Sequence, residues 1–352
     1  EVLPPLARSG VGEEVNMPRT SIRLRRILVT GGAGFVGSHL ADYVLGLGKG
    51  YEVIGTKRWH LSRMDNVRHI MDRVTMVDCD LTDPVGVRDM IETVKPDRIF
   101  HCAAESFVSP SWKHPNRYMN VNYHATVNLL DALYYFRSKA PIHLPGSGEE
   151  YGEINEDELP ITPETVMRPV NPYAVSKIAQ DLIGYVYFKS YGINVIRTRA
   201  FNHEGPRRDK VFGIPWYAYQ IARVEEGLQE PILKVGHVDD RRNFTHVTDM
   251  VEAYWLSTER CHPGELYLIG TEAPEYIHTF RQALEMLIGM SRVGGIRYET
   301  DPKYVRPTNV PRLIADTRKF REITGWEPKI QFEKILTDTL EYWRGRVKAG
   351  TA

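Results

Sequence analysis

Residues 26–37, RILVTGGAGFVG, constrain the fold more than any other stretch of the chain. Residues 27–29 form a short apolar run of the kind that a buried parallel strand needs. Three spaced glycines follow, and the pattern over residues 38–47 predicts a helix. A strand, a glycine turn and a helix point free backbone N–H groups and the positive end of a helix dipole at a pyrophosphate. The segment therefore predicts a dinucleotide site, with a plain tight turn as the alternative. Its expected contacts are Gly31, Gly34, Phe35, Val36 and Gly37.

Further apolar runs alternate with helical patterns through the first 200 residues. The runs predict strands at 51–56, 74–77, 98–102, 142–144 and 193–198. The patterns between them predict helices at 84–94, 115–136 and 172–191. This alternation predicts a doubly wound parallel α/β sheet, a Rossmann domain over residues 25–200.

After residue 199 the alternation is expected to break, because the sequence becomes richer in proline and in segments that predict loops. Helices are predicted at 214–226, 246–257, 278–288 and 332–344. Residues 201–352 are expected to form mainly a smaller, mixed α/β substrate domain, and a return of strands or helices to the first domain stays open. We expect residues 1–24 to be an N-terminal extension.

Composition favours a small-molecule ligand. The 45 basic residues balance 45 acidic ones, so net charge does not draw the chain toward nucleic acid or a membrane surface. Three cysteines, Cys79, Cys102 and Cys261, lack metal-ligand spacing, and their odd number argues against a disulfide framework. We therefore expect a cytoplasmic protein with no metal, nucleic acid or membrane partner.

The end of the second predicted strand bears on the choice of cofactor. In NAD-binding sheets an acidic residue usually stands there, whereas this chain has Thr56, Lys57 and Arg58. Two cations suit the 2′-phosphate of NADP, so NADP is favoured over NAD. A solvated Lys-Arg pair is the alternative. Later strand ends predict further contacts: Asp80 and Leu81 beside the adenine, and Ala103 and Ala104 where the cofactor passes closely.

A tyrosine with a lysine one helical turn later can act as a base in nicotinamide chemistry. The ammonium lowers the pKa of the phenol and can hold the nicotinamide ribose. This spacing begins at Tyr135, Tyr173 and Tyr185, but only Tyr173 follows a predicted helix start and belongs at the carboxyl edge of the sheet. Tyr173 with Lys177 is therefore the candidate pair. The other two pairs are expected to be helix-surface or packing residues.

The fifth strand ends in LPGSGEEYG, residues 144–152. The hydroxyl of Ser147 is suited to bond the reacting oxygen, and Glu149 beside it is a second acid/base candidate. A polar strand-end turn is the alternative. The arrival of Tyr173 at the same edge favours a catalytic role.

Taken in order, six segments resemble the extended short-chain dehydrogenase/reductase family of nucleotide-sugar enzymes. They are TGGAGFVG, HCAAES, SGEEYG, PYAVSK, RAFNHEGPRR and RRNFTHVTD. The resemblance spans roughly residues 25–347 and is strongest to GDP-mannose 4,6-dehydratases and the related GDP-4-keto-6-deoxymannose reductases. It implies Ser147, Tyr173 and Lys177 as a triad, with Glu149 as the dehydratase base. It also implies a GDP-sugar substrate, GDP-mannose first, bound by Ser106, Asn202, Arg208, Arg242 and Arg306. For each arginine the alternative is a surface ion pair.

The resemblance implies a reaction without net redox change. Tyr173 takes the proton of the 4-hydroxyl as NADP⁺ takes the hydride, and the resulting ketone acidifies the hydrogen on carbon 5. Glu149 removes that hydrogen and helps to expel the 6-hydroxyl as water. The hydride then returns to carbon 6, which gives a GDP-4-keto-6-deoxy sugar.

Two positions depart from the family pattern, and other functions stay open. Ser147 is followed by Gly148 where the dehydratases often have Thr followed by Ser, and Asn309 stands where a Glu usually follows the Arg306 motif. The second hypothesis is an NADPH-dependent 4-ketoreductase. A 4-epimerase is third, because epimerases need no carboxylate at Glu149, and a non-catalytic NADP-sensing protein is the alternative from another class. A homodimer or homotetramer is expected, through the helices that begin at Pro115 and Pro172.

Overall fold

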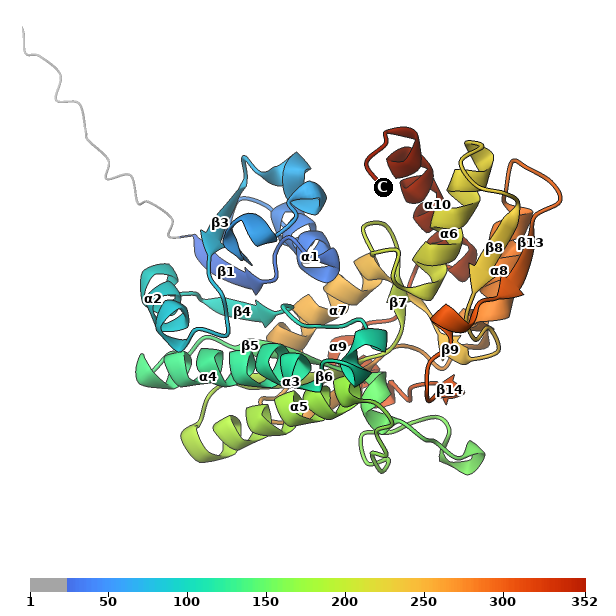
Figure 1. The fold of residues 1–352 in the computed structure, drawn as a ribbon. Helices are drawn as coiled ribbons and strands as arrows, with labels where there is room; N and C mark the ends of the chain where they lie inside the picture. The colour runs from blue at the N-terminus through green and yellow to red at the C-terminus, as the bar shows by residue number, and fades with distance from the viewer. Residues whose placement is uncertain (1–23) are drawn as a thin grey trace, which may run out of the picture.

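A computed structural model describes residues 24–352, so the predicted extension lies outside the described residues except for Leu24. Seven parallel strands form one sheet in the order β3, β2, β1, β4, β5, β6, β11 (Figure 1). In that order they are Val74–Asp78, Tyr51–Lys57, Arg25–Thr30, Arg98–His101, Ile142–Ser147, Val195–Ala200 and Leu266–Ile269. The sheet confirms the predicted doubly wound Rossmann fold.

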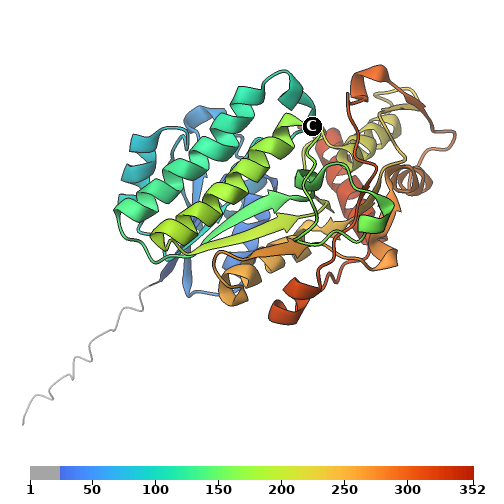
Figure 2. The same cartoon turned by 90° about the horizontal axis from the view of Figure 1, so that it is seen from below.

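Two layers of helices cover the sheet, because alternate side chains of its strands point to opposite faces. On β1, Leu28 packs toward one layer, while Ile27 and Val29 pack toward the other, and all three are essentially inaccessible. The first layer holds α2 (Pro84–Val94), α4 (Ala125–Tyr135) and α5 (Pro172–Tyr191). The second holds α1 (Phe35–Gly46) and α7 (Val247–Arg260), and Figure 2 shows the sheet between the layers.

The predicted helix over residues 115–136 is interrupted. It consists of α3 (Pro115–Tyr118), a π-helical turn at Met119–His124, and α4. The π turn buries Asn122, whose side-chain amide donates to Ser176 Oγ at 2.9 Å and whose Oδ1 accepts from the Glu105 backbone N–H at 2.8 Å. Turns of this kind concentrate at functional sites, and this one joins α4 to α5 beside the carboxyl edge of the sheet.

The regular alternation breaks after β6, but the chain also returns to the sheet, a possibility that the sequence left open. After an excursion, the chain returns as α7 and then as β11, which pairs in parallel with β6. A short helix, α9 (Arg318–Thr324), also packs Phe320 into the core on this side. The strand β11 itself was not predicted, because it has only four residues and Leu266 pairs with Arg197, 69 residues earlier in the chain.

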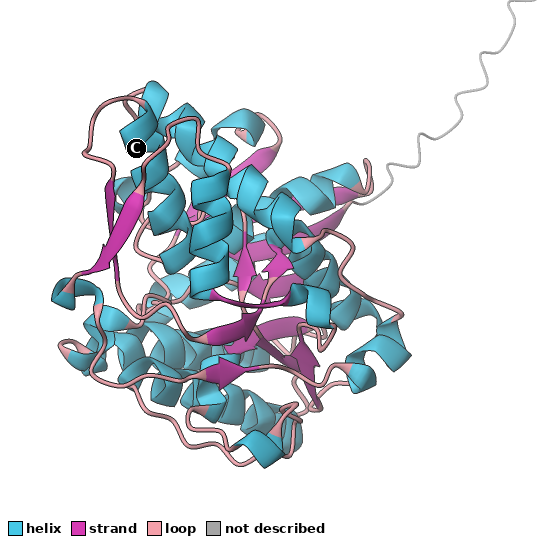
Figure 3. Cartoon of the chain, turned by 90° about the vertical axis from the view of Figure 1, so that its right-hand side faces the viewer, coloured by secondary structure: helices cyan, strands magenta, loops and turns pink. Residues whose placement is uncertain are grey.

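The remaining C-terminal segments form a smaller mixed α/β region with its own core, as predicted. Three helices, α6 (Gly213–Glu225), α8 (Phe280–Gly289) and α10 (Phe332–Lys348), pack together. Figure 3 views this region from its own side, with helices and short strands in front of the sheet. Its strand pairings are β8 (Ile232–Val235) with β13 (Arg297–Thr300), and β9 (Arg241–Asn243) between β12 (Ile277–Thr279) and β14 (Arg312–Leu313). A further pair, β7 (His203–Glu204) and β10 (Thr245–His246), links it to the sheet edge. Within residues 24–352, no helix is both long and apolar enough to span a bilayer.

Candidate active site

The glycine turn between β1 and α1 allows close backbone approach. Gly31 has a φ of +65°, and a Cβ added there would lie 2.9 Å from the Cα of Ala103. A Cβ on Gly37 would overlap the carbonyl oxygen of Gly31. Side chains at these positions would force the turn, α1 and the end of β4 apart. Thr56 Oγ1 fixes the turn further by accepting a hydrogen bond from the Gly31 N–H at 3.0 Å.

The N-terminus of α1 fits the diphosphate of a dinucleotide. Gly34 precedes the helix in an extended conformation, and no described side chain caps the first turn. Helix N-terminal N–H groups without such a cap are free for an anion, and the helix dipole favours negative charge there. Gly34 and Phe35 open directly onto the main cavity, which has a volume of about 470 Å³.

The cavity lies where the sequence predicted the cofactor. Most of the predicted contacts line its wall, whereas Val36, Gly37, Tyr173 and Lys177 are not among the residues that line it. The predicted residues on the wall are Gly31, Gly34, Phe35, Thr56, Lys57, Arg58, Asp80, Leu81, Ala103, Ala104, Ser106 and Arg208.

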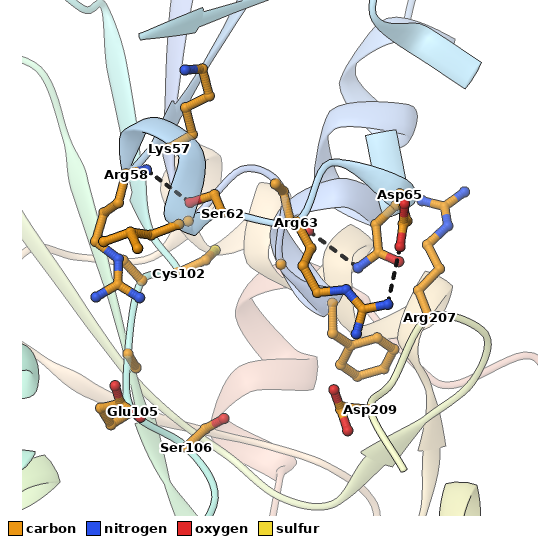
Figure 4. A pocket seen from close by; sticks show the side chains of 18 of the residues that line it. Lys57, Arg58, Ser62, Arg63, Asp65, Cys102, Glu105, Ser106, Arg207 and Asp209 are labelled. Atoms are coloured by element: carbon orange, nitrogen blue, oxygen red, sulfur yellow. Dashed lines mark hydrogen bonds and ion pairs between the residues drawn. The ribbon is translucent and has the colours of Figure 1, made fainter. Parts of the chain in front are cut away.

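The two cations after β2 differ in their surroundings. The Lys57 ammonium forms an ion pair with Asp78 at the end of β3, and Figure 4 shows the Lys57 side chain directed away from the Arg58 guanidinium. Arg58 extends along the cavity, and its backbone N–H donates to Ser62 Oγ at 2.8 Å. Arg58 is therefore better placed than Lys57 to meet a phosphate.

One wall of the cavity was not predicted. The connection after β2 contributes Arg63 and Asp65, and α10 contributes Arg346. Asp65 accepts from Arg63 at 3.2 Å and from Arg346 at 3.3 Å, which joins the last helix to the first domain. No sequence signal could identify this wall, because Arg346 lies 281 residues from Asp65 and looks like an ordinary polar position of an amphipathic helix.

Tyr173 and Ser147 meet at the carboxyl edge of the sheet. Tyr173 stands in the first turn of α5, 8% exposed, with its ring edge-on to Tyr118 at 6.3 Å between centroids. Ser147 is the last residue of β5, and its hydroxyl lies close enough to the Tyr173 phenol to favour the phenolate. Burial raises the pKa of Tyr173 above its ordinary value, whereas the Ser147 hydroxyl and the charge of Arg208 lower it.

Lys177 lies one helical turn after Tyr173 on α5, as the sequence predicts. Its ammonium donates to the Pro145 carbonyl oxygen at 2.6 Å and to the Gln180 side chain, so it is held against β5. Lys177 is not among the main causes of the shift in the Tyr173 pKa, which is upward on balance. Burial instead lowers the pKa of Lys177 itself to about 8.

Glu149 lies between Tyr173 and the second region. Its Oε2 accepts a hydrogen bond at 3.1 Å from the side-chain amide of Asn171, whose Oδ1 caps α5 by accepting from the Ala174 N–H at 2.8 Å. The Glu149 charge opposes ionisation of the Tyr173 phenol and favours the charged form of Arg242. Asn171 was not predicted as a site residue, because its hydrogen bond to Glu149 could not be read from the sequence.

The predicted substrate residues divide into two groups. Ser106 and Arg208 line the cavity, with Arg208 over the rings of Phe35 and Phe212, at 5.6 and 4.2 Å from their centroids. The Arg208 guanidinium also pairs with the buried carboxylate of Glu204 at 3.3 Å.

The second group lies beyond Glu149. Asn202 is half-buried just after β6, and its carbonyl oxygen accepts from Thr245 N at 3.0 Å. Arg242 is 3% exposed on β9 and donates to the Val310 carbonyl oxygen at 2.6 Å. Arg306 is close enough to disfavour the charged form of Arg242 electrostatically. The arrangement places Arg242 near the carboxylate of Glu149, with Arg306 close to Arg242.

A protein-family model described as "GDP-mannose 4,6 dehydratase" matches residues 28–339, most of the chain. The chain belongs to this family. The match confirms the resemblance found in the sequence.

Family relatives cover nearly the whole chain. The GDP-mannose 4,6 dehydratase 2 of Arabidopsis thaliana is 31% identical, over 92% of this chain and 89% of its own length. The GDP-6-deoxy-D-mannose reductase of Pseudomonas aeruginosa is 30% identical, over 92% of this chain and 99% of its own. The structure of RMD from Pseudomonas aeruginosa complexed with NADPH superposes with a TM-score of 0.79 at 29% identity, covering 92% of this chain and 99% of that one.

Both departures from the family pattern have local explanations. A Cβ on Gly148 would lie 3.1 Å from the ring of Phe201, so this position packs tightly beneath an aromatic side chain. Asn309 donates a hydrogen bond to Asp240, a mostly buried carboxylate 3.8 Å from the Arg242 guanidinium. A carboxylate is thus present beside Arg242 although residue 309 is not acidic.

Proposed function

We propose that this member of the family is a GDP-mannose 4,6-dehydratase that works with NADP. The observation that supports this most is the convergence of a phenol, a hydroxyl and a carboxylate, from Tyr173, Ser147 and Glu149, close to Arg208 of the cavity wall. A base for the 4-hydroxyl and a separate base for carbon 5 are the two groups that a 4,6-elimination requires.

Tyr173 and Ser147 serve carbon 4 of the sugar. The bound nicotinamide would supply a hydride acceptor at carbon 4 and a donor at carbon 6. Ser147 holds the 4-oxygen, and Tyr173 takes its proton. Arg208 and the Ser147 hydroxyl both favour the phenolate, which offsets part of the burial that disfavours it. The Lys177 ammonium donates to the Pro145 carbonyl oxygen, which holds it beside the strand that ends at Ser147.

Glu149 serves carbons 5 and 6. Once carbon 4 is a ketone, the hydrogen on carbon 5 is acidic enough for a carboxylate to remove it. The Asn171 amide holds one oxygen of Glu149 and leaves the other free to take this proton and deliver it to the departing 6-hydroxyl. The net change at this stage is the loss of one water.

Arginines from both regions suit the diphosphate of a nucleotide sugar. Arg208 approaches from the cavity, and Arg242 and Arg306 approach from the second region. A guanidinium binds phosphate in a two-pronged manner, which favours these side chains over lysines. Ser106 and Asn202 are assigned to the same substrate.

The preference for NADP is supported by the cationic end of the cavity. Arg58 and Arg63 extend into it, and acidic residues are absent from the described end of β2, where a carboxylate would select NAD. The NADPH in the Pseudomonas aeruginosa structure is consistent with this choice.

One specific observation favours a second candidate, an NADPH-dependent ketoreductase acting on the 4-keto-6-deoxy sugar: the chain aligns with 99% of the length of the Pseudomonas reductase. The test is incubation with GDP-mannose and catalytic NADP⁺. The dehydratase gives a product lighter by one water, whereas the reductase leaves GDP-mannose unchanged and consumes NADPH stoichiometrically with the keto sugar. Dinucleotide binding without either reaction would favour a non-catalytic sensor.

We also propose that the protein forms at least a homodimer through α3, α4 and α5. Large apolar side chains of α5 lie on its outer surface, with Val175, Leu182 and Val186 each 45–48% exposed. They recur at helical spacing and form one apolar stripe, as expected for a face that packs against a second copy. A cytoplasmic location stays a prediction, with Cys79, Cys102 and Cys261 all free thiols.

A further inference from the structure

Glu150 is adjacent to the proposed base Glu149 but faces the protein interior. Its side chain is 0% exposed, an unusual place for a carboxylate that has no contact with the cavity. Glu150 follows the strand that carries Ser147, and the sequence pattern predicted no role for it. A buried charge of this kind requires partners that hold it.

The two oxygens of Glu150 contact two different elements. Oε1 accepts a hydrogen bond from the Ser147 backbone N–H at 2.7 Å, and Oε2 forms an ion pair with Arg199 Nε at 2.6 Å. Gly146 makes room for this arrangement, because a Cβ there would lie 2.5 Å from Oε1. The carboxylate therefore links the end of β5 to β6.

Arg199 begins a chain of buried charges that continues behind the sheet edge. Its Nη2 donates to Asp181 Oδ2 at 2.9 Å, and Asp181 also accepts two hydrogen bonds from Arg197, at 2.6 and 2.9 Å. Lys177 lies one turn before Asp181 on α5, 3% exposed. The buried cations are Arg197, Arg199 and Lys177, and the buried carboxylates near them are Glu150 and Asp181. Loss of either carboxylate would therefore increase the excess of buried positive charge.

We propose that Glu150 is a positioning residue for the reaction: it fixes the backbone that presents Ser147, and it supplies the buried negative charge that faces the Lys177 ammonium. The effect on turnover rests on the proposed function. The effect on Lys177 does not, because it is a property of the free protein.

The charges around Lys177 make Glu150 the partner that matters most. Burial lowers the pKa of Lys177, and Glu150 opposes this more than any other group, followed by Asp181. Burial also raises the pKa of Glu150, while its ion pair with Arg199 opposes that shift and favours the carboxylate. The remaining titratable groups that face Lys177 are Cys102, His101 and His143. Burial lowers the pKa of both histidines to about 3, so they are neutral over the range in which Lys177 titrates.

The direct test follows the ionisation of Lys177 in substrate-free protein. Lysine labelled with ¹³C reports protonation through the Cε chemical shift, and Lys177→Arg assigns the signal. In Glu150→Gln, Oε1 can still accept the Ser147 N–H, but the charge is removed. The Lys177 midpoint is expected to fall by about one pH unit, the size typical of losing one close opposite charge. Glu153→Gln, the same change at an exposed site three residues away, should leave the midpoint unchanged.

A second variant separates position from charge and does not depend on Glu150→Gln folding. Glu150→Asp keeps the charge but is too short to reach both Ser147 and Arg199. We expect a Lys177 midpoint like that of the wild type, together with a tenfold or larger fall in kcat at every pH. An unshifted midpoint in Glu150→Gln, or full kcat in Glu150→Asp, would overturn the proposal. Failure of the proposed function would instead appear as no turnover of wild-type protein, with the titrations unaffected.

Discussion

The side-chain amide of Asn171 donates to the carboxylate of Glu149 at 3.1 Å while its oxygen caps α5. One residue therefore orients the proposed base and starts the helix that carries Tyr173 and Lys177. Changes at Asn171 should separate the helix-capping role from the catalytic one.

Asn171→Ser should lower kcat with little loss of stability. Serine is a good helix cap, but it has no amide to hold Glu149. Losing a hydrogen bond to a charged group costs about 1.5 kcal/mol, so we expect a roughly tenfold fall in kcat. Asn171→Ala should show the same kinetic loss and, in addition, a fall of about 1 kcal/mol in the free energy of unfolding. Equal kcat for wild type and both variants would show that Asn171 does not orient Glu149 for the reaction.

Tyr173→Phe should abolish turnover while sparing dinucleotide binding. Removal of a general base typically costs 10²- to 10⁴-fold in rate, and the phenylalanine ring keeps the packing against Tyr118. Tyr185→Phe is the matched control, because it lies on the same helix with a lysine at the same spacing but is 41% exposed. Rates and fluorescence titration with NADPH measure both effects. Turnover retained in Tyr173→Phe would rule out its assigned role.

Arg58→Ala should weaken NADP binding more than Lys57→Ala does. Arg58 extends along the cavity, so its loss removes a charged hydrogen bond to phosphate, worth about 2 kcal/mol or roughly thirtyfold in Kd. Lys57 is already paired with Asp78, and such exposed pairs contribute little. Calorimetry with NADP⁺ and NAD⁺ measures the preference. The opposite ranking of the two variants would show that the ammonium leaves Asp78 for the ligand.

Stability should fall as the pH drops from about 6.5 to 4, in part because of His39. Burial, helped by the charge of Arg207, lowers the pKa of His39 from 6.5 to about 4, so over this range the unfolded chain binds a proton that the folded chain does not. The folded state loses about 1.4 kcal/mol per pH unit for each such group. His39→Gln should flatten the pH dependence of urea unfolding, while His60→Gln, at an exposed site, should not. Equal slopes in the two variants would contradict this assignment.

Leu182→Glu should convert the proposed dimer into a monomer. Leu182 lies in the centre of the exposed stripe on α5, where a buried carboxylate without a partner is costly. Light scattering on a sizing column gives the mass directly. Val85→Glu, at a 66% exposed site on α2, serves as the control. A mass that is the same for wild type and Leu182→Glu would place any subunit contact elsewhere.

Local sequence patterns were enough for six of the seven strands of the central sheet and for α5. The apolar run at residues 27–29 and the glycines after it identify β1 and its turn, because burial and close approach leave few other residue types possible. The bounds of α5 follow from Asn171 and Pro172 at its start and Gly192 at its end, which are local signals of capping and termination.

Long-range contacts could not be read from the sequence. The ion pair of Lys57 with Asp78 joins two strand ends, and that of Glu150 with Arg199 joins two strands. The Arg346 contact with Asp65 likewise needs the folded arrangement of both regions. Each of these side chains looks like an ordinary charged residue until its partner is known. The sequence therefore predicted which residues gather at the sheet edge but not how their charges pair.

The most direct test of the central claim is the fate of deuterium placed on carbon 4 of GDP-mannose. With catalytic NADP⁺, the dehydratase account predicts a product lighter by one water that retains the deuterium, now on carbon 6, as mass spectrometry and NMR would show. Unchanged substrate, or a product of the same mass as GDP-mannose with inverted configuration at carbon 4, would contradict it.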